Sequence, residues 1–307
     1  MSSKNEIKVS VCVVTYNQEK YIAECLQSLV DQETDFPFEI IVGEDCSTDN
    51  TREVVRYFSE RYPGVIKPIF NSINLGATKN YFNTHKKAQG DYVFHMDGDD
   101  LAYPGKLQTQ VDYLESNTDV VCCWHRAQVF SDDGILHSVR ESKLEEIVNP
   151  VNLGLSDFLK YGVLGCHSSL VYRKKYFSKV KVLDGDVLDF YIAVSLLSQG
   201  KGANINKVLG GYRFNPRAAT ASNGRFLIFK GSPLKKLYLS HLKSFSKDYP
   251  EYSDCIFFNS LYNSLVELRK MRFKLAIGFV SLALKNVSKD ALVSFFSDFV
   301  KFRKACR

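Results

Sequence analysis

Val93-Phe94-His95-Met96-Asp97-Gly98-Asp99-Asp100 is the stretch of sequence that decides the fold. An apolar run ends here in three carboxylates within four positions, Asp97, Asp99 and Asp100. A strand that ends in this way presents hard oxygen ligands at its tip, which a divalent metal carrying a diphosphate requires. An isolated Asp-x-Asp is more often an acidic turn after a buried strand, so the neighbouring elements decide between the two interpretations.

Apolar runs and helical patterns alternate in the residues before this stretch. The runs at 8–14, 38–42, 66–70 and 92–96 predict buried strands, while residues 19–31 and a segment from about Thr51 carry apolar side chains at helical spacing. This alternation predicts an α/β fold with a mostly parallel sheet and right-handed crossovers. Ligands bind at the carboxyl ends of such strands. We therefore expect three polar clusters on one rim: Thr15-Tyr16-Asn17, Glu44-Asp45 and Asp97 to Asp100.

The pattern after Tyr103 is mixed. Residues 106–115 predict a helix, 120–124 a buried strand, 131–150 a polar loop or excursion, and 188–197 a helix, and the chain is predicted to be helical from about Pro233. We expect a catalytic domain over 1–220, with a donor half at about 8–105 and an acceptor half at about 106–220. A basic helical region follows over 221–307.

Charge is unevenly distributed along the 307 residues. Residues 201–307 hold 20 Lys and Arg against 6 Asp and Glu, whereas residues 1–200 hold 20 against 28. This asymmetry predicts an acidic catalytic half and a basic half that meets an anionic surface, which we expect to be a membrane and not a nucleic acid.

Segment and cysteine patterns predict a cytoplasmic location. Residues 1–6 have no apolar signal core, and the apolar stretch from Leu275 to Leu284 is ten residues, against about 20 for a membrane span. The eight cysteines include no Cys-x-x-Cys pair and no zinc-like partner spacing, which fits reduced thiols in a reducing compartment.

The order of the motifs carries a family resemblance. Residues 9–17, residues 40–51, Asn74-Leu75-Gly76 with Asn80, and residues 90–100 followed by Pro104 together resemble the family-2 inverting glycosyltransferases of the GT-A fold. Each motif alone is weak, but their order and spacing are highly specific. The resemblance covers about residues 8–215, and it implies a GT-A nucleotide-binding sheet flanked by helices, with the helical region as a C-terminal extension.

The resemblance assigns a donor site to the predicted rim. The implied nucleotide-binding residues are Thr15, Tyr16, Asn17, Glu44, Asp45, Asn74, Lys79 and Asp97. Asp97 is expected near the ribose and metal, Asp99 as a direct ligand of Mg²⁺ or Mn²⁺, and Asp100 as the residue that orients the loop. These ligands are all oxygen, which disfavours zinc. Two alternatives stay open: Tyr16 as an aromatic that covers the core, and Lys79 as a solvated lysine.

An inverting transfer also needs a base on the acceptor side. The acidic run at residues 183–190 precedes an apolar helix and resembles the family's acidic motif, so Asp186 is our first candidate, Asp189 the second and Asp184 the third. Val187 stands where the family often has an aromatic residue, which leaves the register open, as does helix capping by these acids.

Three residues are candidate acceptor contacts: Trp124, His167 and Arg213. A structural role is the alternative for each. Asn215 stands where the family often has a histidine that contacts the metal or diphosphate.

The resemblance implies a hexosyl transfer with inversion, from a nucleotide-diphosphate donor (a UDP-sugar) to a glycan in bacterial polysaccharide synthesis. An O-antigen or capsule intermediate linked to undecaprenyl diphosphate is the expected acceptor. The C-terminal segment has apolar residues at helical spacing and a basic end (Leu292, Phe295, Phe296, Phe299 and Phe302, then Lys301, Arg303, Lys304 and Arg307). It fits either a helix packed on the core or an interfacial helix on the inner leaflet of the cytoplasmic membrane.

Two other classes compete with this interpretation. A sugar nucleotidyltransferase needs a Gly-rich loop after the first strand, and residues 15–24 contain no glycine. A non-catalytic nucleotide- or glycan-binding protein of the same fold would be favoured by loss of the Asp-x-Asp, which is intact here. A dehydrogenase lacks support, since no Gly-x-Gly-x-x-Gly follows the first strand.

Overall fold

The structure is a computed structural model that describes residues 6–132, 136–140, 152–161, 165–180, 189–214, 232–269, 273–288, 290 and 295. The chain divides into two compact units, each assembled from separate parts of the sequence. The sheet unit comprises Met1–Glu141, Gly165–Asp186 and Gln199–Phe214. The helical unit comprises Ser142–Leu164, Val187–Ser198 and Asn215–Arg307.

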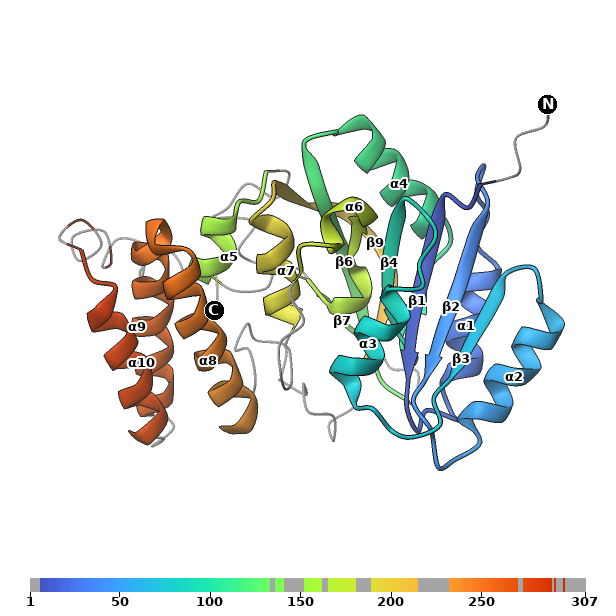
Figure 1. Ribbon diagram of the computed structural model, residues 1–307, viewed down its shortest axis with the longest axis horizontal. Coiled ribbons are helices and arrows are strands. Elements are labelled where there is room, and N and C mark those ends of the chain that lie inside the picture. Colours follow the sequence, from blue (N-terminus) through green and yellow to red (C-terminus); the bar gives the residue numbers. More distant parts are fainter. Residues whose placement is uncertain are drawn as a thin grey trace. The chain divides into compact units, whose positions relative to one another are not determined.

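The sheet unit is built on one mixed sheet, in the order β3-β2-β1-β4-β8-β6-β9-β5. Figure 1 shows its neighbouring strands β3, β2, β1 and β4 side by side. The strands are β1 (Val9–Thr15), β2 (Phe38–Glu44), β3 (Ile66–Phe70), β4 (Tyr92–Asp97), β5 (Leu101–Ala102), β6 (Val120–Phe130), β7 (Leu136–Arg140), β8 (Val171–Arg173) and β9 (Lys201–Arg213). The predicted α/β fold is confirmed, and the four strands predicted in the first 100 residues are β1 to β4.

The strand register brings the predicted polar clusters together. β1 pairs in parallel with β2, with Thr15 opposite Glu44, and in parallel with β4, with Val14 opposite Asp97. The three strands therefore end on one rim, as the sequence predicts.

Helices cover both faces of the parallel strands. The sheet-unit helices are α1 (Ile22–Val30), α2 (Thr51–Arg61), α3 (Ala77–His85), α4 (Lys106–Ser116) and the short α6 (Lys174–Phe177). Val9, Val11 and Val13 of β1 share a core with the apolar face of α1. The intervening Cys12 lies against α3, with its Sγ 3.9 Å from the Thr84 carbonyl oxygen. Since alternate strand residues point to opposite faces, α1 and α3 cover opposite faces of the sheet.

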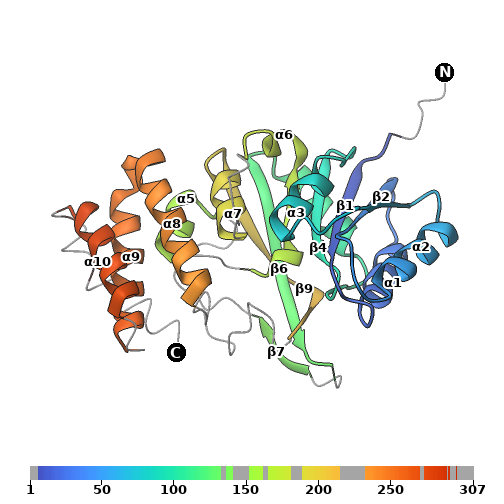
Figure 2. The same ribbon diagram turned by 60° about the horizontal axis from the view of Figure 1, so that its bottom comes forward.

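The other half of the sheet is partly antiparallel. β8 is antiparallel to both β4 and β6. β9 runs parallel to β6, and β7 pairs antiparallel with the end of β6 (Figure 2). The prediction of a polar loop is wrong over Leu136–Arg140, because the end of the long β6 offers hydrogen bonds that a polar edge strand can complete. The rest of 133–150 lies outside the described residues.

The helical unit contains α5 (Leu155–Tyr161), α7 (Asp189–Leu197), α8 (Ser232–Asp248), α9 (Ser253–Arg269) and α10 (Phe273–Lys285), with the short turn η3 (Pro250–Tyr252). Its core is aromatic: the Phe190 ring lies 4.8 Å from that of Tyr238, and the Tyr191 ring stacks on Phe245 at 5.6 Å. The prediction of helices after Pro233 is confirmed over the described ranges. Within those ranges, no helix is both long and apolar enough to cross a membrane.

Candidate active site

Two loops at the rim are bonded to each other through their side chains. The Asn17 side-chain oxygen accepts a hydrogen bond from the Thr48 backbone N–H (2.8 Å), and the Asn17 backbone N–H donates to Ser47 Oγ (3.0 Å). The Asn50 N–H and side-chain amide both donate to the Glu19 carboxylate. Asn17 has φ 53°, a left-handed conformation that asparagine tolerates. The loop after β1 (15–19) and the loop after β2 (45–51) are thus one bonded layer.

The acids at the end of β2 have distinct partners. Glu44 is fully buried, accepts the Ser47 N–H at 2.6 Å and pairs with the Arg52 guanidinium. Asp45 accepts hydrogen bonds from the backbone N–H groups of Leu75 and Gly76, each at 2.9 Å. Glu44 therefore ties the strand end to α2, and Asp45 fixes the loop before α3. A carboxylate has about four acceptor positions, so Asp45 retains capacity for a further donor.

Three of the other predicted nucleotide contacts are exposed, and one, Thr15, is buried. Tyr16 is 45% exposed, Asn74 is exposed and accepts the Gly76 N–H, and Lys79 is exposed on α3. Thr15 is buried and its Oγ1 lies 2.8 Å from Gln18 Oε1. These contacts leave Tyr16 and Lys79 available to a ligand, and the nucleotide-binding roles stay predictions.

The acidic turn after β4 is held by a serine and an arginine from elsewhere in the chain. Ser168 Oγ donates to the buried Asp100 carboxylate (2.6 Å) and accepts the Asp97 N–H (3.0 Å). The Arg213 N–H donates to the other Asp100 oxygen (2.9 Å), and its Nε donates to the Asp99 carbonyl (2.9 Å). The buried Asp100 carboxylate is therefore bonded to both η2 (His167–Ser169) and the end of β9, contacts consistent with the loop-orienting role that the resemblance implies.

Gly98 permits the turn to lie close to the end of β1. A Cβ on Gly98 would stand 2.6 Å from Gln18 Oε1 and 3.0 Å from the Thr15 Cβ. A side chain at position 98 would therefore displace the Gln18 amide and press on Thr15 at the end of β1.

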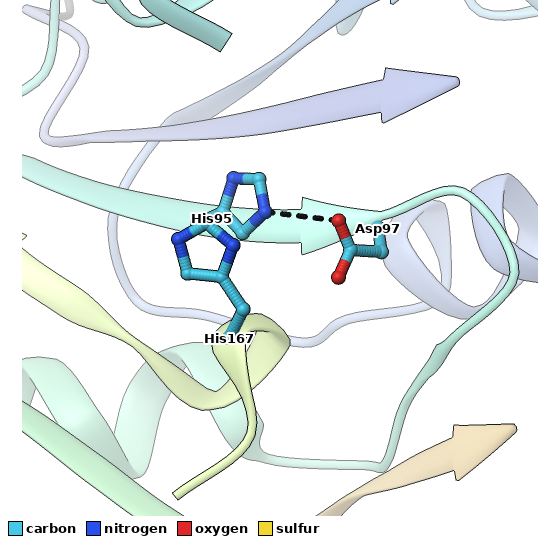
Figure 3. Close-up of side chains that lie close together, drawn as sticks. All are labelled: His95, Asp97 and His167. Atoms are coloured by element: carbon cyan, nitrogen blue, oxygen red, sulfur yellow. Dashed lines mark hydrogen bonds and ion pairs between the residues drawn. The ribbon is translucent and has the colours of Figure 1, made fainter. Parts of the chain in front are cut away.

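A group of imidazoles lies directly beside Asp97. His95 and Asp97 are two residues apart in β4 and share the sheet face that α3 covers. His95 Nε2 lies 3.1 Å from Asp97 Oδ1, and its Nδ1 lies 3.1 Å from His85 Nε2 on α3. His167, from the short 3-10 helix η2 (His167–Ser169), packs against His95 with ring centroids 3.7 Å apart (Figure 3).

Burial and charge perturb the titration of this region. Burial, followed by the neighbouring Asp97 carboxylate, raises the pKa of Asp99 to about 6. Burial also raises the pKa of Asp100 well above its ordinary value, and the Asp99 and Asp97 charges add to that shift. Burial lowers the pKa of His85 well below its ordinary value, with smaller effects from His95 and His167, so His85 is a neutral imidazole near pH 7.

The donor atoms at the turn fit a divalent cation. Like charges from three adjacent carboxylates are crowded in a partly buried turn, and a cation relieves that repulsion. Among the described residues, one group of three ligand-type side chains has ligand atoms all within 4.8 Å of one another: His95, Asp97 and His167. Asp97 was predicted at the metal and belongs to this group. Asp99 does not belong to it, and its role as a direct ligand stays a prediction.

Of the predicted base and acceptor residues, the structure describes Asp189, Trp124, His167 and Arg213. Asp189 is exposed in the first turn of α7, in the helical unit, while Asp184 and Asp186 lie outside the described residues, as does Asn215. Trp124 is 2% exposed on β6 and packs under Gly165, which favours its structural alternative. Arg213 is 7% exposed and bonded within the sheet unit.

Sequence reasoning missed His95, His85 and Ser168. His95 had a usable signal, because a residue two positions before Asp97 in a strand points to the same face. His85 and Ser168 had none, since their contacts depend on how α3 and η2 pack on that face.

Solved structures place this architecture in the GT-A fold class. S. aureus TarS 1–349 in complex with UDP-GlcNAc aligns with a TM-score of 0.63 at 20% identity, over 98% of this chain and 82% of that one. The mannosyltransferase PcManGT from Pyrobaculum calidifontis, in complex with GDP-Man and Mn²⁺, aligns with a TM-score of 0.60 at 16% identity, over 98% and 83%. At these identities the likeness shows the fold alone.

Sequence comparison gives the family. The family model described as glycosyl transferase family 2 matches residues 10–180, and the chain belongs to that family. An uncharacterised protein of Mycobacterium bovis is 28% identical over 206 residues, 67% of this chain and 58% of that protein. The putative glycosyltransferase EpsE of Bacillus subtilis is 31% identical over 176 residues, covering 57% and 59%. The abequosyltransferase RfbV of Salmonella typhimurium is 33% identical over 116 residues, covering 38% and 35%. The chain thus spans less than two thirds of the length of these relatives.

Proposed function

We propose that this chain transfers a hexosyl group from a nucleoside-diphosphate sugar, a UDP-sugar, to a glycan hydroxyl with inversion at the anomeric carbon. The observation that carries the proposal is the rim on which Thr15, Glu44 and Asp97 end three neighbouring parallel strands. Family membership and the nucleotide sugars named with TarS and PcManGT support the same donor class.

The chemistry divides between two sides of the transferred sugar. On the acceptor side Asp186, or Asp189, takes the proton of the attacking hydroxyl. The new bond forms at the anomeric carbon as the bond to the diphosphate oxygen breaks, and the electron pair leaves with the nucleoside diphosphate. Mg²⁺ or Mn²⁺ bound at Asp97 and Asp99 would neutralise the charge of that leaving group.

The donor is tested by release of nucleoside diphosphate. Purified protein is incubated with a panel of nucleotide sugars, with Mn²⁺, Mg²⁺ or EDTA, and free nucleoside diphosphate is measured. We expect metal-dependent release from one UDP-sugar and a loss of at least a hundredfold in Asp99→Ala. Donor binding with no turnover on any sugar or acceptor would favour the non-catalytic alternative.

The base is tested separately from the donor site. Asp186→Asn is expected to bind the donor with an unchanged dissociation constant and to stop transfer, because the amide cannot accept the proton. Asp189→Asn is the matched variant, since it makes the same change at the second candidate. Near-normal transfer by Asp186→Asn would refute the assignment of Asp186 as the base.

We propose a lipid-linked glycan acceptor, carried on undecaprenyl diphosphate at the inner face of the cytoplasmic membrane, because the C-terminal region is basic. Flotation of the full chain with vesicles is expected to require anionic lipid and to weaken with salt. Equal flotation with neutral vesicles would contradict electrostatic docking.

A further inference from the structure

Asp97, the first acid of the Asp-x-Asp, lies with two histidines in a group that is not made of oxygen ligands alone. His95, Asp97 and His167 offer two imidazole nitrogens and one carboxylate oxygen. Imidazole nitrogen suits divalent transition-metal ions, with an affinity that rises from Mn²⁺ through Co²⁺ to Cu²⁺, whereas Mg²⁺ takes oxygen ligands. We propose that His95, Asp97 and His167 together bind one divalent transition-metal ion, and that the two histidines make this chain select such an ion over Mg²⁺.

The separations suit a single ion. With metal–nitrogen bonds of about 2.1 Å, ligands at right angles lie roughly 3 Å apart and opposed ligands about 4.2 Å apart. His95 Nε2 and Asp97 Oδ1 lie 3.1 Å apart, and all three ligand atoms lie within 4.8 Å of one another. His95 and Asp97 therefore already have the spacing of ligands at right angles. The 4.8 Å bound exceeds the separation of opposed ligands by about 0.6 Å, which rotation of the His167 side chain must close.

The ligand positions are fixed by contacts outside the group. Ser168, which follows His167, bonds the Asp97 N–H and the Asp100 carboxylate, so η2 and the end of β4 are joined. The Tyr81 ring stacks on His167 with centroids 5.4 Å apart. Pre-positioned ligands of this kind reduce the ordering that metal binding requires.

The nitrogen of His95 that faces away from Asp97 has the partner that a metal ligand needs. His95 Nδ1 lies 3.1 Å from His85 Nε2, and His85 Nδ1 lies 2.7 Å from the Tyr172 hydroxyl. Without an ion, protons point along this chain toward Asp97, and His95 donates to the carboxylate. With an ion on His95 Nε2, the chain reverses: His95 donates to His85 and His85 donates to Tyr172. Such outer hydrogen bonds orient metal-bound histidines and fix their tautomer.

The group is open to solvent on one side, where the ion could bind a further ligand. The His95 side chain is fully buried, whereas the Asp97 side chain is 37% exposed and His167 is partly exposed. Three protein ligands on one side leave the solvent side of the ion free for phosphate oxygens. The inference rests on the proposed function only for the binding of phosphate oxygens to the ion, since binding of the ion by the protein needs no turnover.

The test is electron spin-echo spectroscopy of Mn²⁺ bound to the full chain without nucleotide. We expect nitrogen modulation from histidine, a shift of that modulation on ¹⁵N-histidine labelling, and retention of Mn²⁺ in a tenfold excess of Mg²⁺. His167→Ala should weaken Mn²⁺ binding at least tenfold, and His95→Gln should do the same if it folds. His241→Phe, which removes a histidine of the helical unit, is the control and should leave binding unchanged.

Several results would overturn the assignment. These are Mn²⁺ bound without nitrogen modulation, displacement of Mn²⁺ by an equal concentration of Mg²⁺, no Mn²⁺ binding by the wild-type chain, or modulation that persists unchanged in His167→Ala. If the wild-type chain binds Mn²⁺ through nitrogen but turns over no nucleotide sugar, the proposed function is contradicted and the metal site is supported.

Discussion

Arg213 shows how one side chain holds the acidic turn. Its guanidinium lies over the rings of Tyr21 and Phe130, with centroid distances of 4.6 and 4.5 Å. It donates to Glu24 at 2.6 Å and to the Asp99 carbonyl at 2.9 Å. The planar fork makes these contacts together, which a lysine ammonium cannot do.

We therefore predict that Arg213→Lys lowers the stability of the sheet unit by about 2 kcal/mol, because two charge-assisted or buried hydrogen bonds are lost. The melting temperature, measured by circular dichroism, should fall by about 5 °C. Arg61→Lys, on the exposed face of α2, is the matched control and should melt within about 1 °C of the wild type. Equal melting temperatures of the two variants would show that the Arg213 guanidinium contributes nothing to stability beyond what a lysine does.

The packing of α3 on β2 depends on a glycine. A Cβ on Gly43 would lie 2.0 Å from Thr84 Oγ1 and 2.7 Å from Asn80 Oδ1, both on α3. Asn80 Nδ2 also donates to the Gly43 carbonyl at 2.8 Å, so the helix and strand are in direct contact there.

Gly43→Ala should therefore push α3 from the strand and destabilise the protein by about 2 kcal/mol, as overpacking of a tight seam does. Urea unfolding followed by the fluorescence of Trp124, the single tryptophan, measures the change. Gly64→Ala is the control: a Cβ there meets nothing within 4 Å, and its stability should stay within about 0.5 kcal/mol of the wild type. A Gly43→Ala midpoint equal to that of Gly64→Ala would refute the close approach.

The elements differ in how far the sequence predicts them. β1, β2 and β4 are apolar runs because both sheet faces are covered, so hydrophobicity alone reveals them. α3 has no such signal: its buried Asn80 and His85 are bonded to Gly43 and Tyr172, partners that only the folded neighbours supply. β8 is three residues long, and β9 contains Gly210-Gly211 beside the ring of Phe130 and the imidazole of His125, so neither has a recognisable strand pattern.

The same division applies to the candidate site. The rim could be predicted because parallel strands end at one edge, and the register confirms it. The histidine group could not, since it joins β4, α3 and η2, three elements whose contacts are tertiary.

At the scale of the whole molecule, the two units carry separate reporters. Trp124 reports the sheet unit, whereas α8, α9 and α10 contribute strongly to the helical signal. In the helical unit, burial lowers the pKa of His241 to about 4. Its ring lies 5.3 Å from that of Tyr191, and its Nε2 meets no hydrogen-bond partner within the part of the chain that the structure describes.

Acid is predicted to destabilise the helical unit through His241. Between pH 6.5 and 4 the unfolded state binds a proton that the folded state does not, so stability falls as pH falls, by up to about 3 kcal/mol below pH 4. His241→Phe keeps an aromatic ring beside Tyr191 and removes the titration. Denaturant unfolding at pH 7 and pH 5, followed at 222 nm, should show a smaller loss for the variant. The Trp124 transition serves as the internal control, and an equal loss in both proteins at 222 nm would contradict the prediction.

The bonded layer of the two rim loops has a consequence for protein engineering. Residues 15–19 and 45–51 satisfy each other's backbone N–H groups through Ser47, Asn17 and Glu19. A graft that imports one loop from a relative leaves donors of the other without acceptors. Chimaeras of this family should therefore take both loops from the same parent protein, although about thirty residues of sequence separate the two loops.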